Sequence, residues 1–455
     1  MVYLAYLIPF SAGILFTVFL LLARKIFYSL ALSSVRMLDG ILSNEADELV
    51  KQKLLIARII PLLKSLFIFL IGFFVALLIT VYPINWFNSF DVSSNLYWLF
   101  FSIATIFPFV AVSFFKRSDK KDYDEINQLL HHLSLDNYFI SNFLLNFELR
   151  RFKKKLPEKK EKYVVITGLA RSGTTALTKL LFTSQRFHSL KYYNVPFLMN
   201  PKSFNSGKKS KEKERAHGDN VLFSQDSVEA LEEYFFKAEL HDQFIEGDFL
   251  LKHSISKEAN EKYLQYQNLL TDVNETTYLT KNNNFILRYP AMRRLNDEFI
   301  CFFMFRDPID HALSLLSQHK KFVQLQTEDP FVLDYMNWLG HHEFGLGFKP
   351  FLFDEKLAWD SEALLDINFW LKDWINYYRE VINLPQHKNT HILSYEEFLH
   401  SPETIIEKIG NCSNIQLGIV KPSVFNNKKS IELKIDLEIK EEAYKVYHRL
   451  EEIKH

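Results

Sequence analysis

The chain has 455 residues, and its 54 Lys and Arg balance 54 Asp and Glu, so the formal net charge at pH 7 is zero. A chain without excess basic charge has no global field that attracts polyanions, so we expect no nucleic-acid partner. Its two cysteines are too few for a disulfide framework or a cysteine-built zinc site.

The first third of the chain carries three long apolar segments. They cover residues 2–23, 65–83 and 97–115, contain no charged side chain, and each approach the ~20 residues that a helix needs to cross a bilayer. Buried core helices could imitate one such segment but hardly three, and no basic residue precedes the first, as one would in a signal peptide. The sequence therefore predicts a membrane region over residues 1–117 with three transmembrane helices.

Basic residues predict how this region is oriented. The connection between the first two segments is basic, whereas the second connection, residues 84–96, contains no Lys or Arg; the basic residues of the first are Arg24, Lys25, Arg36, Lys51, Lys53, Arg58 and Lys64. Lys116, Arg117, Lys120 and Lys121 follow the third segment. By the positive-inside rule, everything after the third segment is cytoplasmic. We expect an integral, multi-pass membrane protein with the lipid bilayer as a partner.

Residues 118–162 are expected to connect the membrane region to the remainder of the chain. Leu and Phe recur at helical spacing from Tyr123 to Phe152, which predicts helices. Lys153 to Lys162 is a charge-rich linker. Its charges are most simply solvated, although Lys153-Lys154-Lys155 could also contact anionic lipid.

Residues 163–422 are long enough for one α/β domain, and residues 423–455 are expected to form a helical tail. Apolar strands are predicted near residues 163–167, 299–305 and 391–394, and longer helical patterns separate them. This alternation predicts a mostly parallel sheet flanked by helices. Ligands of such sheets bind beyond the carboxyl ends of the strands.

The first of these strands runs into a glycine-bounded turn and then a helix that starts near Thr174. Gly168 and Gly173 allow a tight bend, so that backbone N–H groups and the positive end of the helix can converge on a phosphate. The spacing is that of a Walker A loop. Thr174 and Thr175, however, stand where an NTPase has Lys followed by Ser or Thr, and the fixed cation is Arg171. These differences argue against ATP hydrolysis.

The loop Arg171-Ser172-Gly173-Thr174-Thr175 resembles the 5′-phosphosulfate-binding loop of the PAPS-dependent sulfotransferases. The apolar strand that ends in Arg306-Asp307-Pro308, with Ser314 eight residues after Arg306, resembles that family's 3′-phosphate site. The stretch around Tyr395-Glu396 and, more weakly, residues 335–345 resemble further family segments, the latter from a bacterial-type branch. The resemblance covers residues 163–409 and implies the P-loop-like sulfotransferase fold. It implies donor binding by Gly168, Arg171, Ser172, Gly173, Thr174, Thr175, Arg306 and Ser314.

Arg171 is also an expected catalytic residue, because its charge fits the task of neutralising the leaving phosphate, and the resemblance implies a second one. Lys281 precedes the Phe299 strand at about the distance where cytosolic family members have Lys-Thr-His, which implies a catalytic lysine at a strand end that faces the donor. The position of that family's catalytic histidine is Asn283 here, and an Asn side chain cannot act as a general base. Another residue must therefore take up the proton of the acceptor.

His217 is the first choice for this proton acceptor, because unperturbed histidine titrates near neutrality and Gly218 beside it suggests a shaped turn. The alternatives are the nearby carboxylates Asp219, Asp226, Glu229 and Glu232, although a carboxylate on a helix surface is more often solvated. His341, His342 and Glu343 could imitate a metal cluster. Adjacent histidines on a helix point in different directions, so no metal is expected.

Together, these expectations predict a membrane-anchored sulfotransferase with a cytoplasmic catalytic domain. Its donor would be PAPS, and its acceptor would be a hydroxyl group. A lipid or glycan is the expected acceptor, because tethering an enzyme with a soluble donor is useful when the acceptor is not soluble. One alternative is a P-loop nucleotide kinase or NTPase. Another is a non-catalytic membrane scaffold that retains the fold.

Overall fold

The structure is a computed structural model in which two compact units, Met1–Asp136 and Asn137–His455, can be distinguished. It describes residues 9–19, 59–76, 98–99, 101–104, 125–154, 161–203, 213–214, 222–223, 231–270, 276–353, 359–418 and 434–454, together with positions 23, 26, 34 and 78.

The N-terminal unit contains one candidate transmembrane helix among its described residues. This helix, Ile59–Ala76, has 18 residues and a mean hydropathy of 2.4. The apolar helix Pro9–Phe19 is shorter, and at about 1.5 Å per residue it falls well short of the hydrocarbon thickness of a bilayer. Only residues 98–99 and 101–104 of the third predicted span are described. The prediction of three transmembrane helices, and with it a multi-pass protein, is therefore not supported.

Helix α4, Glu125–Leu135, also belongs to this unit.

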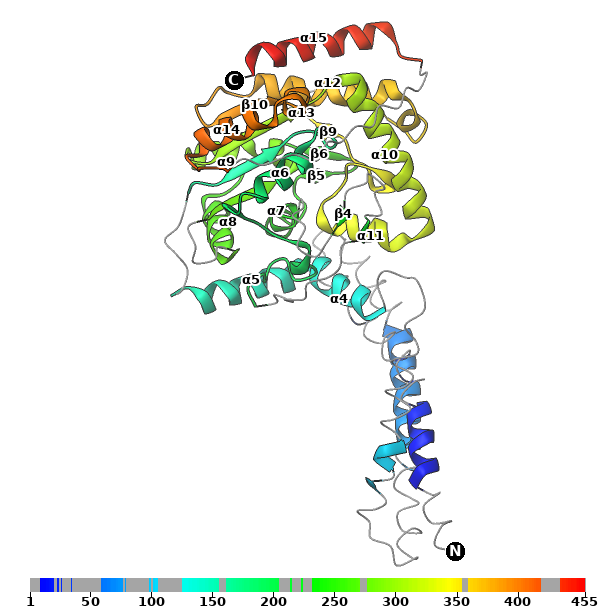
Figure 1. Ribbon diagram of the computed structural model, residues 1–455. Coiled ribbons are helices and arrows are strands. Elements are labelled where there is room, and N and C mark those ends of the chain that lie inside the picture. The colour runs from blue at the N-terminus through cyan, green and yellow to red at the C-terminus, as the bar shows by residue number, and fades with distance from the viewer. Residues whose placement is uncertain are drawn as a thin grey trace, which may run out of the picture. The chain divides into compact units, whose positions relative to one another are not determined.

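The C-terminal unit is built on a five-stranded parallel sheet with the order β10-β8-β1-β7-β2 (Figure 1). The strands are β1 (Val164–Thr167), β2 (Phe187–His188), β7 (Thr277–Lys281), β8 (Ile300–Phe305) and β10 (Thr390–Ser394). The predicted strands near residues 163–167, 299–305 and 391–394 are confirmed within one residue at each end. The predicted α/β architecture with a mostly parallel sheet is also confirmed.

Helices cover the sheet on both faces, and further small strands lie outside it. The helices are α5 (Tyr138–Phe152), α6 (Thr174–Phe182), α7 (Glu233–Leu240), α8 (Lys257–Leu270), α9 (Tyr289–Leu295), α10 (Pro308–Glu328), α11 (Pro330–Leu339), α12 (Ile367–Asn383), α13 (Tyr395–His400), α14 (Pro402–Ser413) and α15 (Leu437–Ile453). The pair β3 (Lys213–Glu214) and β4 (Leu222–Phe223) is antiparallel, and β5 (Ile245–Glu246), β6 (Phe249–Leu251) and β9 (Phe351–Leu352) form a three-stranded sheet.

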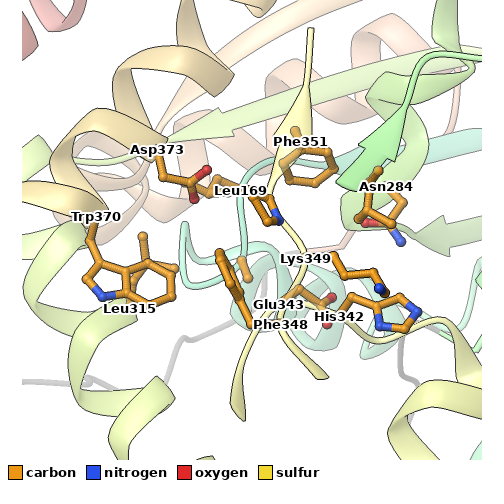
Figure 2. Close-up of a pocket in the computed structure, with 13 residues that line it drawn as sticks. Leu169, Asn284, Leu315, His342, Glu343, Phe348, Lys349, Phe351, Trp370 and Asp373 are labelled. Atoms are coloured by element: carbon orange, nitrogen blue, oxygen red, sulfur yellow. The ribbon is translucent and has the colours of Figure 1, made fainter. Parts of the chain in front are cut away.

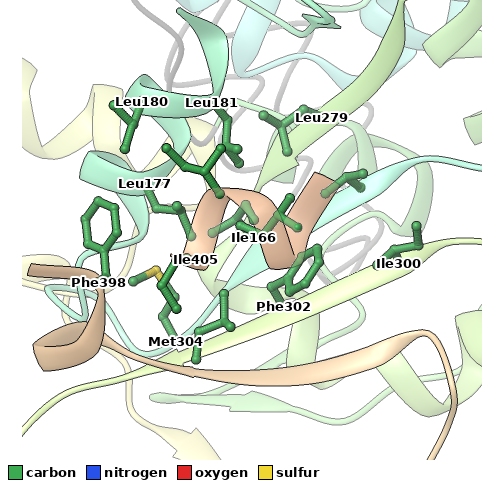
Figure 3. Close-up of a cluster of buried hydrophobic side chains, with 14 of the residues drawn as sticks. Ile166, Leu177, Leu180, Leu181, Leu279, Ile300, Phe302, Met304, Phe398 and Ile405 are labelled. Carbon is green, nitrogen blue, oxygen red and sulfur yellow. The ribbon is translucent and has the colours of Figure 1, made fainter. Parts of the chain in front are cut away.

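The core explains why strand β8 is apolar without interruption. On one face, Phe302 and Met304 pack with residues of β1, α6 and α14 in the cluster shown in Figure 3. On the other face, the ring of Phe303 lies 5.6 Å from that of Tyr289 on α9, and the ring of Phe305 lies 5.5 Å from that of Tyr447 on α15. Since both faces are covered, all six residues of β8 are buried.

Helices form the two described ends of this unit: α5 lies within the predicted helical segment 123–152, and α15 lies within the predicted tail 423–455. Helix α5 packs against α7 and α8, and α15 packs against α12 through the buried side chains of Ala443, Val446 and Leu450. The predicted boundary between the catalytic domain and the tail, at residues 422 and 423, lies outside the described residues.

Candidate active site

The turn after β1 is held against the neighbouring strand β8. Gly168 has φ 151°, and a Cβ atom there would lie 2.5 Å from the carbonyl oxygen of Met304. The Ser172 amide donates to the carbonyl of Leu169 at 3.1 Å, which closes the turn. Gly173 follows with φ 98° as the N-cap of α6. The two glycines predicted to shape the loop therefore occupy conformations that favour glycine.

Helix α6 begins without a side chain that caps it. Its N-cap is Gly173, and no acidic residue lies in its first turn. Helix α10 differs, because the carboxylate of Asp307 accepts hydrogen bonds from the amides of Ile309 and Asp310 at 3.0 Å. The first amides of a helix have no partner within the helix. The predicted anion-binding residues Thr174 and Thr175 thus start a helix whose positive end fits a phosphate group.

The two predicted phosphate-binding motifs meet at Arg171 and Ser314. Arg171 Nε donates to Ser314 Oγ at 3.1 Å, although the two residues are 143 positions apart. Arg171 also has φ 73°, a left-handed conformation that costs a residue with a side chain about 1–2 kcal/mol. Backbone strain of this kind is common where a side chain must be aimed at a ligand.

His311 on α10 holds the loop after β1 through a hydrogen bond to its backbone. Its Nε2–H donates to the carbonyl of Ala170 at 2.7 Å, and its Nδ1 accepts from Trp374 Nε1 at 3.1 Å, which assigns the neutral tautomer. The pKa of His311 is lowered to about 3, chiefly by burial and in part by the positive charges of Arg306 and Arg171. Both guanidinium groups therefore lie within electrostatic range of one imidazole. This positioning residue carries no signal in the sequence, because its partners lie 141 and 63 positions away.

Tyr395 connects Arg306 to the loop. The guanidinium carbon of Arg306 lies 4.9 Å from the centroid of the Tyr395 ring, and the same ring fills the space beside Gly173. The neighbouring Glu396 accepts a hydrogen bond from the Asp307 amide at 3.0 Å. Burial raises the pKa of Glu396, whereas the Asp307 amide lowers it. The Tyr395-Glu396 stretch thus fixes the strand end that carries Arg306.

Gly173→Ala should destabilise the protein by about 2–5 kcal/mol, because a left-handed φ and overpacking act together. A Cβ atom at position 173 would lie 2.3 Å from Tyr395 Cδ2. Gly247→Ala is the matched control, since Gly247 has φ 56° but nothing within 4 Å of a Cβ atom. Denaturant unfolding should show a loss of only about 1 kcal/mol for Gly247→Ala. Equal losses in both variants would show that Tyr395 does not pack closely on the loop.

A carboxylate that the sequence analysis did not select lies at the end of β7. Lys281, the last residue of β7, is 9% exposed, and Asn283 follows in a 3-10 turn. Asn283 Nδ2 donates to Glu343 Oε1 at 3.1 Å, and His341 Nδ1 lies 3.4 Å from the same oxygen. Burial alone would raise the pKa of Glu343, but His341 and Lys281 hold it at about 2. Glu343 is therefore ionised at neutral pH.

Gly340 brings this segment to β7. It ends α11 in a left-handed conformation, φ 76°, and its carbonyl accepts from Asn284 Nδ2 at 3.2 Å. His341 and His342 lie beyond the helix, so their expected position on a helix is wrong. His342 Nδ1 pairs with the carbonyl of Gly347 at 3.0 Å and not with Glu343. No group of three His, Cys, Asp or Glu suited to a metal ion occurs in the part of the chain that the structure describes.

Of the proposed proton acceptors, only Glu232 belongs to the described residues. His217, Asp219, Asp226 and Glu229 lie outside them. The carboxylate of Glu232 accepts hydrogen bonds from the hydroxyls of Tyr263 at 2.6 Å and Tyr278 at 2.7 Å. Burial raises its pKa, and the side chain is 2% exposed. The expectation of a solvated helix-surface carboxylate is therefore wrong for Glu232. This residue holds the end of β7, because it also accepts from Asn282 Nδ2 at 3.4 Å.

A small cavity separates the loop from the Glu343 segment (Figure 2). Leu169 and Ala170 of the loop line it, as do the carboxyl groups of Glu343 and Asp373 and an apolar wall formed by Leu250, Leu315, Phe348, Phe351 and Trp370. Asp373 projects from α12, and burial raises its pKa to about 7. The two carboxyl groups of this cavity therefore differ strongly in the pH at which they ionise.

Asp373→Asn should stabilise the protein at pH 8 by up to about 4 kcal/mol, since one pKa unit corresponds to about 1.4 kcal/mol. The folded-state pKa of Asp373 is raised to about 7 from 3.8, so the unfolded chain ionises first and stability falls as the pH rises between these values. Unfolding at pH 4 and pH 8 should therefore show a gain that grows with pH. Asp248→Asn, at a side chain that is 75% exposed, is the control. A gain that does not depend on pH would contradict a buried, ionisable Asp373.

The family model described as sulfotransferase domain matches residues 161–452. The sulfotransferase STF1 of Mycobacterium tuberculosis H37Rv is 10% identical, with a TM-score of 0.38 over 68% of this chain and 81% of that chain. The sulfotransferase STF9 of Mycobacterium avium is 12% identical, with a TM-score of 0.35 over 74% of this chain and 86% of that chain.

A sulfotransferase of Alicyclobacillus acidocaldarius is 15% identical, with a TM-score of 0.28 over 64% of this chain and 94% of that chain. The match over residues 161–452 is the finding that shows the family. No curated protein matches the chain.

Proposed function

This chain belongs to the sulfotransferase family, and we propose that it is a membrane-anchored enzyme that transfers a sulfuryl group from PAPS to a hydroxyl acceptor. The observation that carries the proposal is the hydrogen bond between Arg171 Nε and Ser314 Oγ at 3.1 Å. It joins the residues that the family resemblance assigns to the two phosphate groups of one nucleotide.

The residues at the two strand ends fit such a donor. The uncapped start of α6, Arg171, Thr174 and Thr175 would hold the 5′-phosphosulfate, and Arg306 and Ser314 the 3′-phosphate. When bound, the donor supplies the sulfuryl group. Arg171 and the helix amides stabilise the negative charge on the departing phosphate oxygen, which is the largest task of the protein in such a transfer. Lys281 is the last residue of β7 and pairs in register with Ile166 of β1, so it would add a further positive charge from the neighbouring strand end.

His341 is the proposed proton acceptor, with Glu343 as its orienting partner. An ionised carboxylate beside Nδ1 favours the tautomer with a proton on that nitrogen, so that Nε2 can accept the hydroxyl proton of the acceptor. The new O–S bond forms as the bond from sulfur to the 5′-phosphate oxygen breaks, and the proton moves to His341 Nε2. Asn283, which cannot itself serve as a base, instead donates a hydrogen bond that fixes Glu343.

The proposed acceptor is an amphiphile, such as a lipid or a lipid-linked glycan. Its support is the apolar helix Ile59–Ala76, of which only 6% is buried within the protein, as suits a helix surrounded by lipid. The basic residues that follow residue 115 favour a cytoplasmic catalytic unit. A tethered enzyme meets a membrane-bound acceptor without a search through the solvent.

Nucleotide binding tests the donor site and its main rival. The purified chain should bind adenosine 3′,5′-bisphosphate at least about tenfold more tightly than ATP with Mg²⁺, because Ser314 and Arg306 have no 3′-phosphate to contact in ATP. Calorimetric titration of both nucleotides measures the ratio. Tighter binding of ATP with Mg²⁺ would favour a nucleotide kinase or NTPase and would exclude the proposed donor.

Transfer of label from PAPS carrying ³⁵S tests the reaction. Incubation with membranes of the source organism should give a labelled, solvent-extractable product that mass spectrometry can identify. If bisphosphate binding is found but no product forms with any membrane or soluble acceptor fraction, the chain is a scaffold that retains the nucleotide site.

A further inference from the structure

Helix α5 presents two chemically different faces. Its inner face packs against α7 and α8, with Ser141, Leu145 and Glu148 buried. Ser141 Oγ and Tyr234 Oη share a hydrogen bond at 2.6 Å, and Asn142 Nδ2 donates to the Ala238 carbonyl at 2.8 Å. These contacts fix the rotation of the helix, so its outer face is defined by the fold.

Three phenylalanines form a stripe along the outer face. Phe139, Phe143 and Phe147 are 66%, 61% and 53% exposed, and they follow one another at four-residue intervals. Residues four apart lie on the same side of a helix. A soluble surface rarely exposes three aromatic side chains in a row, and such a contiguous apolar patch marks an interaction site.

Basic side chains continue this stripe at the C-terminal end of α5. Arg150, Arg151, Lys153 and Lys154 are exposed, and Lys202 lies with its Nζ 5.4 Å from the ring centroid of Phe152. The one acidic residue within α5, Glu148, is 0% exposed and accepts a hydrogen bond from the Ser203 amide. The outer face therefore combines exposed aromatic rings with positive charge and carries no acidic side chain.

We propose that this face of α5 lies on a membrane surface that contains anionic lipid. Phenylalanine rings enter the boundary between headgroups and acyl chains, and basic side chains near the surface attract acidic headgroups, which is the pattern of an interfacial helix. A protein partner would supply acidic groups of its own, but the same chain carries the candidate membrane helix Ile59–Ala76, so a bilayer is the proposed surface. The inference rests on the proposed membrane location and not on the donor or the reaction.

Contact with the membrane would orient the catalytic unit. Helix α5 packs on α7, and Glu232 at the start of α7 bonds Asn282 beside Lys281. The face that touches lipid is thus connected through one helix to the end of β7. An amphiphilic acceptor would then reach the site from the membrane surface.

Spin labelling of the full-length chain in proteoliposomes tests the contact. Phe143→Cys, in a Cys412→Ser background, carries a nitroxide; Cys301 is buried and does not react. The measured quantity is the ratio of the nitroxide's collision rate with oxygen to its collision rate with a water-soluble nickel chelate, in vesicles of phosphatidylcholine with phosphatidylserine. This ratio should be at least about threefold higher at position 143 than for a nitroxide at Leu399→Cys, because oxygen concentrates in the apolar layer. Leu399 is 48% exposed on α13. An equal ratio at both positions overturns the proposal, as does a nitroxide that is shielded from both reagents, which would indicate a protein partner.

A nitroxide at Ile68→Cys separates this inference from the proposed anchor. Ile68 is 47% exposed within Ile59–Ala76. Lipid contact at position 68 without contact at position 143 would refute the α5 surface and leave the anchor in place. Contact at position 143 alone would support α5 and refute the anchor.

Replacement of the basic residues tests the role of charge. The variant Arg150→Gln, Arg151→Gln, Lys153→Gln and Lys154→Gln should remove the dependence of the oxygen ratio at position 143 on phosphatidylserine. The matched control replaces four exposed basic residues at α15 by Gln: Lys434, Lys440, Lys445 and Arg449. Figure 1 shows α15 and α5 on opposite sides of the unit. An equal loss in both variants would mean that total charge, and not the α5 surface, attracts the lipid.

Discussion

Arg171→Ala should lower the rate of sulfuryl transfer by about 10²–10³-fold, the range found when one preorganised donor to a developing negative charge is removed. Arg171 projects from the loop that starts α6, and its Nε is already fixed by Ser314 at 3.1 Å. Transfer of ³⁵S from PAPS, measured under single-turnover conditions, reports this step. A variant that transfers label at the wild-type rate would show that Arg171 does not contact the phosphosulfate.

Arg171→Gly separates a catalytic defect from a folding defect. Arg171 has φ 73°, which glycine adopts without strain, so the glycine variant should be more stable than the alanine variant by about 1–2 kcal/mol. Both should be equally inactive, because neither carries a guanidinium group. If activity followed stability across the two variants, the loss in Arg171→Ala would be structural.

Arg379→Ala is a matched control for the loss of an arginine. Arg379 on α12 forms an exposed ion pair with Glu442, and surface pairs contribute at most about 1 kcal/mol. Its replacement should leave label transfer unchanged.

The strands of the site were predictable where local sequence determines them. β1 and β8 are short apolar runs with every residue buried, and their ends carry the motifs at Gly168 and Arg306. β7 was harder to find, because three of the five residues of Thr277–Lys281 are polar or charged, and the strand is buried through packing with α6, β1 and β2. Its last residue, Lys281, was identified by resemblance alone.

The supporting residues were not predictable, because their roles depend on contacts between distant segments. Glu232 appears in sequence as one of several helix-surface carboxylates, yet Tyr263 and Tyr278 enclose it. Glu343 lies 60 positions from the Asn283 that it contacts. The one local signal was Gly340, which ends α11 and turns the following residues toward β7.

His341→Gln should lower the rate of transfer by about 10²–10⁴-fold, the usual contribution of a general base, and should leave the affinity for adenosine 3′,5′-bisphosphate unchanged. The second expectation follows because the side-chain partner of His341 is Glu343, which is not a residue of the phosphate-binding loop. Glu343→Gln should cause a smaller loss, since the imidazole remains but loses its fixed orientation. The double variant should be no worse than His341→Gln alone, because the two residues act as a unit.

His448→Gln and His217→Gln complete the test. His448 is exposed on α15, and its replacement should have no effect. The sequence alone favours His217 as the general base, whereas the structure favours His341. Comparing the transfer rates of the two single variants therefore distinguishes the two candidates. The rate with a thiol or phenol acceptor that is already ionised should recover in the variant that lacks the true base, because no proton then has to be removed. If the transfer rate with the ionised acceptor recovered in His217→Gln, and His341→Gln kept full activity, His217 would be the general base. The contact between His341 and Glu343 would then be structural only.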